Sequence, residues 1–171
     1  MALTHTPGGA ADNSYVTLAE AETYFADRVG ASDNGNWNKD ASGNSRTDAQ
    51  KSTALVTATR RIDEERFFGT KTTGGQALKW PRTEVIDEDG EEYSSASIPR
   101  LVKEATYLTA LELLRVDFLQ ENYLDNVDFM STGTVQIKQF TQGSVGKLPA
   151  EARRLLRNLM VNSGGGRVTR A

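Results

Sequence analysis

Residues 107–119, with the sequence YLTALELLRVDFL, are apolar around most of the circumference of the helix that they would form. Pro99 is a favourable first residue of a helix, and together with this pattern it predicts a helix over residues 99–123. With a rise of about 1.5 Å per residue, this helix is about 35–40 Å long. So wide an apolar surface needs neighbours on several sides, which one small subunit would have difficulty supplying alone. The residues expected to pack against those neighbours are Leu111, Leu114 and Phe118.

Two further helices are predicted on the N-terminal side of this segment. Thr17 and Glu20 have the spacing of a capping box, and the apolar face that follows predicts a helix over residues 18–28. Apolar residues spaced by three and four predict a second helix over residues 47–67, which Gly69 ends. The N-terminal part of the chain therefore also contributes helices to the bundle.

Other segments are rich in turn-forming residues or alternate in polarity. Residues 1–14 are small and polar and predict a loose arm, and the Gly, Asn, Asp and Ser residues of 29–45 predict a loop. Val135 and Ile137 alternate with polar residues, which is the pattern of a strand. Such a strand needs a partner, and the only other strand candidates flank a tight turn predicted at Asp89–Gly90.

The C-terminal segment combines a short amphipathic helix with a flexible tail. The apolar stripe of the helix contains Leu148, Ala152, Leu155, Leu156 and Leu159, and its opposite face holds Arg153, Arg154 and Arg157. Three consecutive glycines precede Arg167 and Arg170. This segment either leaves its own domain to dock on another protein, or folds back to complete its own core. The residues assigned to docking are Leu148, Leu155, Leu156, Leu159, Arg167 and Arg170.

These elements predict a mainly α fold, a helical bundle with a small β-hairpin or strand element and an extended C-terminal helix and tail. The predicted organisation has three parts. Residues 1–14 form a flexible arm, residues 15–143 form the helical domain with its β element, and residues 144–171 form the C-terminal helix and basic tail.

Charge is segregated along this chain, whose formal net charge is −3. Residues 147–171 contain six Lys/Arg and one Glu, a local charge of +5, which leaves −8 for residues 1–146. The sequence has no cysteine, which excludes disulfides and suits a reducing compartment such as the cytosol. It has no run of 18 apolar residues and no signal-peptide pattern at its N-terminus, so no membrane association is expected.

The residue inventory argues against an enzyme, a cofactor site or a metal site. His5 is the only histidine, so a Ser-His-Asp triad or a histidine-based metal centre is not expected. Residues 69–76, GTKTTGGQ, have the glycine spacing of a phosphate-binding loop but lack the Lys-Ser/Thr that follows it. The segments around Gly43 and Gly90 match the middle of an EF-hand loop but lack its end ligands. No catalytic residue, cofactor or metal is therefore predicted.

Residues 76–99 contain a Trp-Pro-Arg corner followed by six acidic residues between positions 84 and 92. Lys79, Trp80 and Arg82 place an aromatic side chain between two cations, which are the ingredients of a base-stacking platform. The acidic residues that follow would repel a phosphate backbone, and the alternative is that Trp80 is buried at the base of a hairpin. The residues assigned to this hairpin loop are Trp80, Arg82, Asp87 and Asp89.

Five stretches of the chain, taken in order, carry a resemblance to a known family. They are SYVTLAEAETYFADR, ALVTATRRIDEERFFGTKT, QALKWPRTEV with the acidic DEDG turn, IPRLVKEATYLTALELL, and LPAEARRLLRNLM followed by GGGRVTR. Together, over residues 14–170, they resemble the neck adaptor proteins of tailed bacteriophages, also called head-tail connector or head completion proteins. Sequences of this type also carry the label of DnaT-like single-stranded DNA-binding proteins. The segment ASDNGNWNKDASGNS is longer than the pattern requires.

The resemblance implies a virion structural protein of the neck, assembled in the host cytoplasm. Its helical subunits would form a ring, commonly of twelve copies, that binds the phage portal protein and offers a docking surface to tail or head-closure proteins. Double-stranded DNA would pass through the channel of this ring without sequence-specific binding. The wide apolar helix would then pack between subunits, and the C-terminal segment would dock on the portal.

The function expected on this basis is that of a structural adaptor and not of an enzyme. The alternative is a single-stranded DNA-binding accessory protein of replication. An adaptor binds portals and ignores oligonucleotides, whereas a DNA-binding protein binds oligonucleotides with strong salt dependence.

Overall fold

Helices dominate the part of the chain that the structure describes, which confirms the predicted mainly α fold. The structure is a computed structural model, and it describes residues 2–28, 31–87, 89–115, 130–132, 135–137 and 148–161. Its helices are α1 (Leu18–Ala26), α2 (Ala31–Asn38), α3 (Asp48–Glu64), α4 (Arg100–Arg115) and α5 (Ala150–Leu156). Its strands are β1 (Thr70–Lys71), β2 (Arg82–Thr83), β3 (Met130–Thr132) and β4 (Val135–Ile137).

Side-chain caps fix where α1 and α3 begin. The predicted capping box of α1 is present, because the Thr17 side chain accepts a hydrogen bond from the Glu20 N–H and the Glu20 carboxylate accepts one from the Thr17 N–H. Thr47 and Gln50 form a second capping box at the start of α3. Both helices therefore start where the sequence predicts, although α3 ends three residues before the predicted end.

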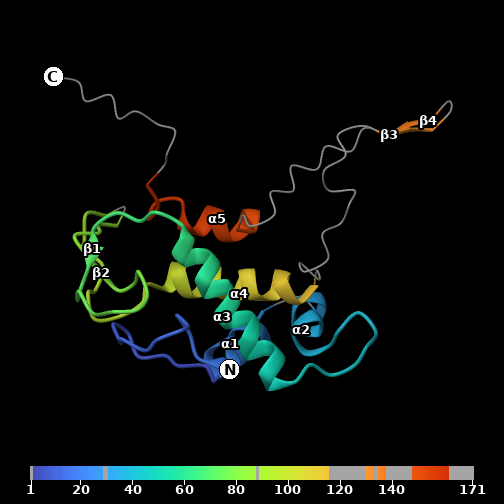
Figure 1. Cartoon of the computed structure of the whole chain (residues 1–171), viewed down its shortest axis with the longest axis horizontal. Coiled ribbons are helices and arrows are strands. Elements are labelled where there is room, and N and C mark those ends of the chain that lie inside the picture. The colour runs from blue at the N-terminus through green and yellow to red at the C-terminus, as the bar shows by residue number, and fades with distance from the viewer. Residues whose placement is uncertain are drawn as a thin grey trace.

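Helix α4 is the centre of the bundle, and α2, α3 and α5 of the same chain pack on it (Figure 1). Leu111 is only 4% exposed, and Leu114 is half-buried. Three helices of its own chain pack on the described part of this helix, and its packing between subunits stays a prediction. Phe118 and the predicted extension to residue 123 lie outside the described residues.

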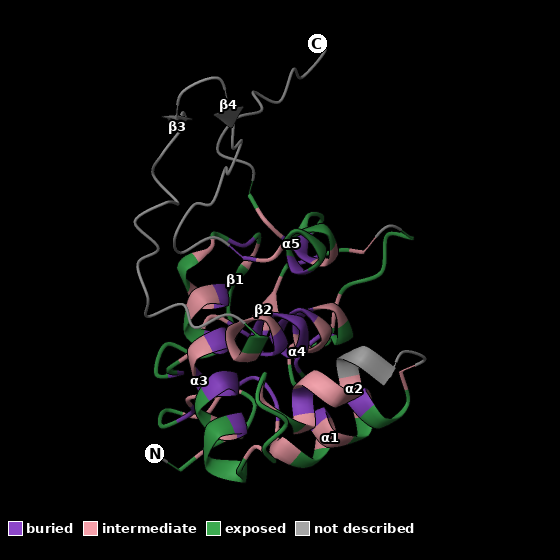
Figure 2. Cartoon of the chain, turned by 90° about the vertical axis from the view of Figure 1, so that its right-hand side faces the viewer, coloured by how far each residue is buried: buried purple, intermediate pink, exposed green. Residues whose placement is uncertain are grey.

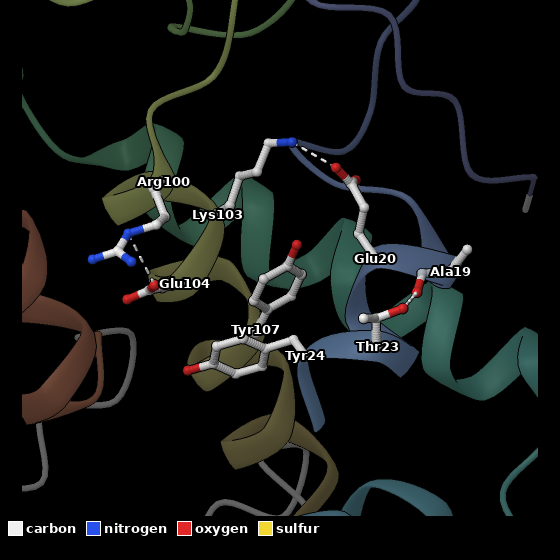
Figure 3. A pocket seen from close by; sticks show the side chains of 8 residues that line it. All are labelled: Ala19, Glu20, Thr23, Tyr24, Arg100, Lys103, Glu104 and Tyr107. Carbon is white, nitrogen blue, oxygen red and sulfur yellow. Dashed lines mark hydrogen bonds and ion pairs between the residues drawn. The ribbon is translucent and has the colours of Figure 1, made fainter. Parts of the chain in front are cut away.

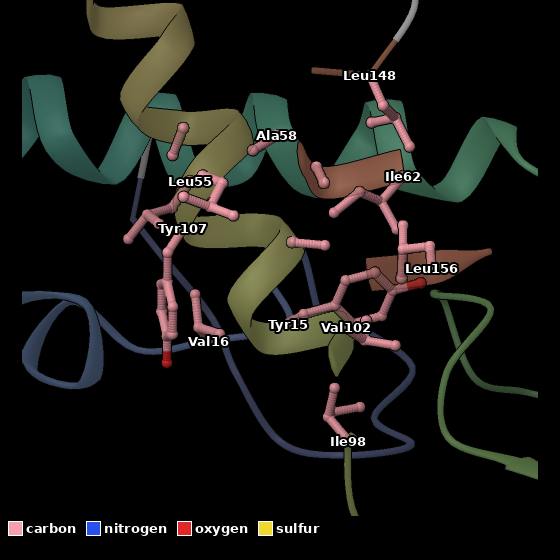
Figure 4. Close-up of a cluster of buried hydrophobic side chains, with 14 of the residues drawn as sticks. Tyr15, Val16, Leu55, Ala58, Ile62, Ile98, Val102, Tyr107, Leu148 and Leu156 are labelled. Atoms are coloured by element: carbon pink, nitrogen blue, oxygen red, sulfur yellow. The ribbon is translucent and has the colours of Figure 1, made fainter. Parts of the chain in front are cut away.

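Apolar side chains from distant parts of the sequence meet around α4 (Figure 4). Tyr15 and Val16 arrive from the segment before α1, Leu55 and Ile62 from α3, and Leu156 from α5. Burying these side chains removes apolar surface from water, which is the main stabilising contribution in a domain of this size.

Helix α2 lies in the segment for which the sequence predicts a loop, so this prediction is wrong. Trp37 is fully buried, and its ring stacks on Phe25 with the ring centroids 4.6 Å apart. Lys51 places its ammonium 5.5 Å from the centre of the Trp37 ring. This packing of one large aromatic side chain outweighs the low helix propensity of the surrounding Asn, Asp and Gly residues.

The strands form two separate two-stranded antiparallel sheets. In the first, β1 pairs with β2, and Thr70 lies opposite Thr83. Gly69 precedes β1 with φ of 71°, and a Cβ atom there would lie 2.1 Å from the Thr83 carbonyl oxygen, so only glycine fits. In the second sheet β4 pairs with β3. The partner predicted from the sequence was instead a strand beside the turn at Asp89–Gly90, which lies farther away along the chain.

The acidic segment folds as a short hairpin, as predicted, although only Ile86 and Glu92 form a β-bridge within it. Asp87 organises its turn, because Asp87 Oδ1 accepts hydrogen bonds from the N–H groups of Asp89 and Glu91 at 3.0 and 2.9 Å. We refer to residues 84–92 as the acidic hairpin.

The N-terminal segment, predicted to be a loose arm, is fastened to the domain over residues 2–14. Asp12 is 8% exposed, and its carboxylate accepts hydrogen bonds from the N–H groups of Thr6 and Gly9. The Gly9 carbonyl in turn accepts a hydrogen bond from the Ala77 N–H at 3.1 Å. The prediction was based on composition, which does not show that the Asp12 side chain closes the turn by which this segment contacts the domain.

Helix α5 completes the core of its own chain. Leu148, Leu156 and Leu159 are at most 5% exposed, and Leu155 is half-buried. Figure 2 shows buried and exposed residues on different sides of α5. Of the two alternatives for this segment, the structure therefore has the one in which it folds back on its own bundle. Arg167 and Arg170 lie outside the described residues.

Candidate nucleic-acid interface

The Trp-Pro-Arg corner does not form a base-stacking platform. Trp80 is 1% exposed and packs edge-on against Phe67, with the ring centroids 5.5 Å apart. Lys79 donates from Nζ to the Glu65 carbonyl at 2.7 Å. This arrangement confirms the alternative in which Trp80 is buried, and it leaves no aromatic surface of Trp80 for a nucleobase.

Arg82 has a structural role at the same corner. Its Nε donates to the Phe68 carbonyl at 2.6 Å, and its Nη1 donates to the Lys79 carbonyl at 3.2 Å. Another donor of the guanidinium bonds to the Gly69 carbonyl. Burial lowers the pKa of Arg82, while the nearby Tyr15 and Asp63 act to raise it. Arg82 thus links Phe68 and Gly69, which follow α3, to the corner that contains Trp80.

Asp63 fastens the corner to α3 from the other side. Its carboxylate accepts hydrogen bonds from the Tyr15 hydroxyl and from the Lys79 N–H, the latter at 3.1 Å. Burial raises the pKa of Asp63, although these hydrogen bonds act to lower it. The corner and the chain beside it are therefore a rigid part of the domain.

Beside this corner, the segment after α3 pairs with the segment after α5. Phe67 and Met160 form an antiparallel bridge, in which the Phe68 N–H donates to the Leu159 carbonyl at 3.0 Å and the Val161 N–H donates to the Arg66 carbonyl at 2.8 Å. Successive side chains on paired segments point to opposite sides. Phe67 is buried, whereas Arg66, Phe68 and Val161 beside the bridge are exposed.

Two apolar side chains are exposed beside this bridge. Phe68 is 48% exposed and Val161 is 39% exposed. They are two of the three large apolar side chains that are exposed within the described part of the chain, and the third is Ile86 in the acidic hairpin. Phe68 thus offers the exposed aromatic ring that Trp80 does not, two residues from the cation Arg66.

Helix α5 adds a row of arginines immediately before this bridge. Ala152 and Leu156 face the core, and the helical period places the arginines on the other side, where all three are exposed. Glu151 is the one carboxylate of this helix, and its Oε1 lies 4.0 Å from Arg154. We call the following residues the α5 surface: Arg66, Phe68, Arg153, Arg154, Arg157 and Val161.

The acidic hairpin lies near the chain that follows α5. A cavity of about 490 Å³ separates them, with Asp87, Asp89 and Ile86 on the hairpin side and Asn158 and Leu159 on the α5 side. Asp87 and Asp89, assigned from the sequence to a hairpin loop, therefore lie across this cavity from the residues that directly follow Arg157. A polyanion on the α5 surface would be repelled by these carboxylates.

The described residues contain no group of three or more His, Cys, Asp or Glu side chains placed to hold a metal ion. Across the same residues, each helix is too short or too polar to cross a bilayer.

The sequence pattern does not identify Phe68 as a surface residue. Phe67 and Phe68 are consecutive, and on an extended segment two consecutive side chains cannot both face the core. This alternation was a signal that one of the two phenylalanines would be exposed, but it was hidden because the helix was predicted to continue to residue 67.

Comparison with protein families places this chain in one of them. A family model described as "Putative DnaT-like ssDNA binding protein" matches residues 1–171. No curated protein and no solved structure matches the chain. The assignment as a phage neck adaptor is not supported, and the prediction of a structural connector that binds the portal is wrong, because the matching family model carries the other label. The match covers the whole chain, which therefore belongs to the family of DnaT-like single-stranded DNA-binding proteins.

Proposed function

We propose that this protein binds single-stranded DNA through the α5 surface. Membership in a family described as single-stranded DNA-binding supports the class of ligand. The observation that carries the choice of surface is Phe68, an aromatic side chain that is 48% exposed on a bridge between two segments that are distant in sequence.

Phe68 supplies the stacking contact of this proposal. Aromatic side chains bind the exposed bases of single strands by stacking, which works for every base because each has a π-face. The backbone around Phe68 is already fixed by Arg82 and by the pairing with Leu159, so little conformational entropy is lost when a base stacks on it.

The arginines supply the contacts with phosphates. Arg153, Arg154 and Arg157 are exposed on α5, and Arg66 lies on the bridge that follows. Arginine binds phosphate through a planar fork of N–H donors, and each neutralised phosphate releases condensed counterions. Basic and aromatic groups on one surface are what a sequence-tolerant site for single strands requires.

The acidic hairpin gives this interface a boundary. The whole chain is acidic, with a formal net charge of −3, so attraction of DNA depends on where the charges lie. Asp87 and Asp89 would repel a strand that crossed from α5 toward the hairpin. The strand is therefore expected to follow α5 and the Phe68 bridge, and the protein acts by binding and not by catalysis.

Fluorescence anisotropy with a labelled single-stranded oligonucleotide tests this proposal. The variant Arg153→Gln/Arg157→Gln removes two exposed cations from α5 and should bind more weakly. It should also reduce the slope of log affinity against log salt by about 1.4, because each phosphate contact of a single strand contributes about 0.7.

The matched control is Arg115→Gln, which removes an exposed cation from the C-terminal end of α4. Leu101, near the other end of α4, lines the same cavity as Leu159. This variant should bind like the wild type. Equal loss of affinity in both variants, or no binding of the oligonucleotide by the wild type at low salt, would contradict the proposal.

A further inference from the structure

A second cavity lies between α1 and α4, apart from the α5 surface, and has a volume of about 470 Å³ (Figure 3). This volume is within the range of about 300–1,000 Å³ that is usual for small-molecule sites. The lining residues from α1 are Ala19, Glu20, Thr23 and Tyr24, and those from α4 are Arg100, Lys103, Glu104 and Tyr107.

Tyr107 gives this cavity a hydroxyl group that no other described side chain uses. The residue is only 5% exposed, and its hydroxyl points toward the Glu20–Lys103 ion pair that lines the cavity (Figure 3). Within the described part of the chain, no residue forms a hydrogen bond with this hydroxyl. A hydroxyl can both donate and accept a hydrogen bond, so this group is available to a ligand in the cavity.

The Tyr107 hydroxyl remains a hydrogen-bond donor at every physiological pH. Burial raises the pKa of Tyr107, and the negative charge of Glu20 raises it further. The group is therefore a neutral phenol that can donate one hydrogen bond to a ligand and accept another.

The charges around the cavity are balanced. Lys103 Nζ lies 2.5 Å from Glu20 Oε1, and Arg100 Nε lies 3.4 Å from Glu104 Oε1. An anion inside the cavity would meet two carboxylates, and a cation would meet Lys103 and Arg100. The cavity therefore favours a ligand whose enclosed part is uncharged and carries both hydrogen-bond donors and acceptors.

The rings of Tyr24 and Tyr107 and the exposed side chain of Arg100 further restrict the class of ligand that the cavity can bind. The rings of Tyr24 and Tyr107 have their centroids 4.5 Å apart and wall one side of the cavity, which suits a planar ring. The side chain of Arg100 is 85% exposed, so it is placed to meet an anionic group that remains outside.

We propose that the cavity between α1 and α4 binds a nucleotide, with the nucleobase against Tyr24 and Tyr107 and the phosphate near Arg100. Lys103 and the Tyr107 hydroxyl offer donors to the carbonyl oxygens of a base, and Glu20 and Glu104 offer acceptors to its amino groups. The nucleotide is either free or part of a strand. This inference does not depend on DNA binding by the α5 surface.

Titration of the full-length protein with each of the four deoxynucleoside 5′-monophosphates, followed by calorimetry or by NMR chemical shifts, tests the inference. At least one of them should bind. Tyr107→Phe, which removes only the hydroxyl, should weaken that binding by about tenfold. Arg100→Gln alters an exposed side chain that folding does not need, and it should weaken the monophosphate more than the corresponding nucleoside.

The matched control is Arg115→Gln, which removes an exposed, ion-paired arginine from the other end of α4 and should leave mononucleotide binding unchanged. Competition by an unlabelled oligonucleotide would identify a base of a strand as the natural occupant, and absence of competition would identify the free nucleotide. Failure of all four mononucleotides to bind at millimolar concentration would overturn the inference. Binding that is unaffected by both Tyr107→Phe and Arg100→Gln would do the same.

Discussion

The guanidinium of Arg82 donates a hydrogen bond to the carbonyl oxygen of Phe68, with Nε 2.6 Å from the oxygen. The two residues are 14 positions apart, and the bond fixes the backbone of the most exposed aromatic ring in the described chain to the buried corner at Trp80. Arg82, which the sequence offers as part of a base-stacking platform, therefore positions Phe68, the aromatic residue that we place in the DNA interface.

Arg82→Met should lower both stability and affinity for single strands. The substitution removes several hydrogen bonds from one charged group to backbone carbonyls, and we expect a loss of about 1.5–3 kcal/mol in the free energy of unfolding. Chemical denaturation measures this loss, and oligonucleotide anisotropy measures the accompanying decrease in affinity. A variant with wild-type stability would show that the Arg82 bonds do not hold the bridge in place.

Trp80→Ala should destabilise the protein strongly, because Trp80 is 1% exposed and packs on Phe67. The expected loss is about 3–5 kcal/mol, which thermal or chemical unfolding would detect. Trp80→Phe, which leaves a smaller cavity, should lose less. If Trp80→Ala instead kept its stability while losing all oligonucleotide affinity, the interface would have to be moved to the corner.

Glu20→Gln should produce a pH-dependent loss of stability. Burial acts to raise the pKa of Glu20, but hydrogen bonds from Lys103 and Thr17 outweigh it, so the pKa is lowered. The folded state thus holds this proton less tightly than the unfolded state, and the stabilisation is present above the unfolded pKa of about 4.3 and lost as the pH falls through the folded pKa.

Glutamine retains the capping box, so the variant isolates the charge of Glu20. Since the ion pair with Lys103 is partly exposed, the deficit at pH 7 should be about 0.2–1 kcal/mol and should shrink toward zero in acid. Unfolding by denaturant at a series of pH values measures it. A deficit that stays constant from neutral to acidic pH would mean that the loss has another cause.

Asp89→Asn should increase affinity for single strands at low salt. Asp89 is exposed in the acidic hairpin, across a cavity from the residues that directly follow Arg157, so its removal relieves repulsion of phosphates. The increase should be about two- to fivefold and should vanish at high salt. Asp48→Asn is the control, since Asp48 is exposed at the opposite end of α3 from Phe68. Equal effects of the two substitutions would place the strand elsewhere.

Local signals in the sequence predicted the helices well. The Thr17–Glu20 capping box and the apolar periodicity of α3 and α4 depend on neighbours within a few residues, so they can be read without the fold. The loop prediction for α2 failed because the reason for that helix is Trp37, whose partner Phe25 lies in another element. The β1–β2 pairing was missed for a similar reason, because two-residue strands have no periodicity to detect.

The candidate site was largely beyond prediction. Whether an aromatic residue is core or surface depends on tertiary contacts, and the sequence places a cation within two residues of both Trp80 and Phe68. Only the fold shows that Trp80 is 1% exposed whereas Phe68 is 48% exposed. The exposed arginines of α5 were predicted correctly, because the apolar stripe of an amphipathic helix identifies the buried face and therefore also the exposed face opposite it.

The most direct measurement of the central claim is the affinity of Phe68→Ala for a single-stranded oligonucleotide. Loss of one base–aromatic stacking contact should weaken binding by about 5- to 150-fold, with little change in stability because the side chain is half exposed. Phe68→Trp, which keeps an aromatic ring, should bind like the wild type, and Ile86→Ala, which removes another exposed apolar side chain, should also have little effect. If Phe68→Ala binds the oligonucleotide as tightly as the wild type, the α5 surface is not the DNA interface.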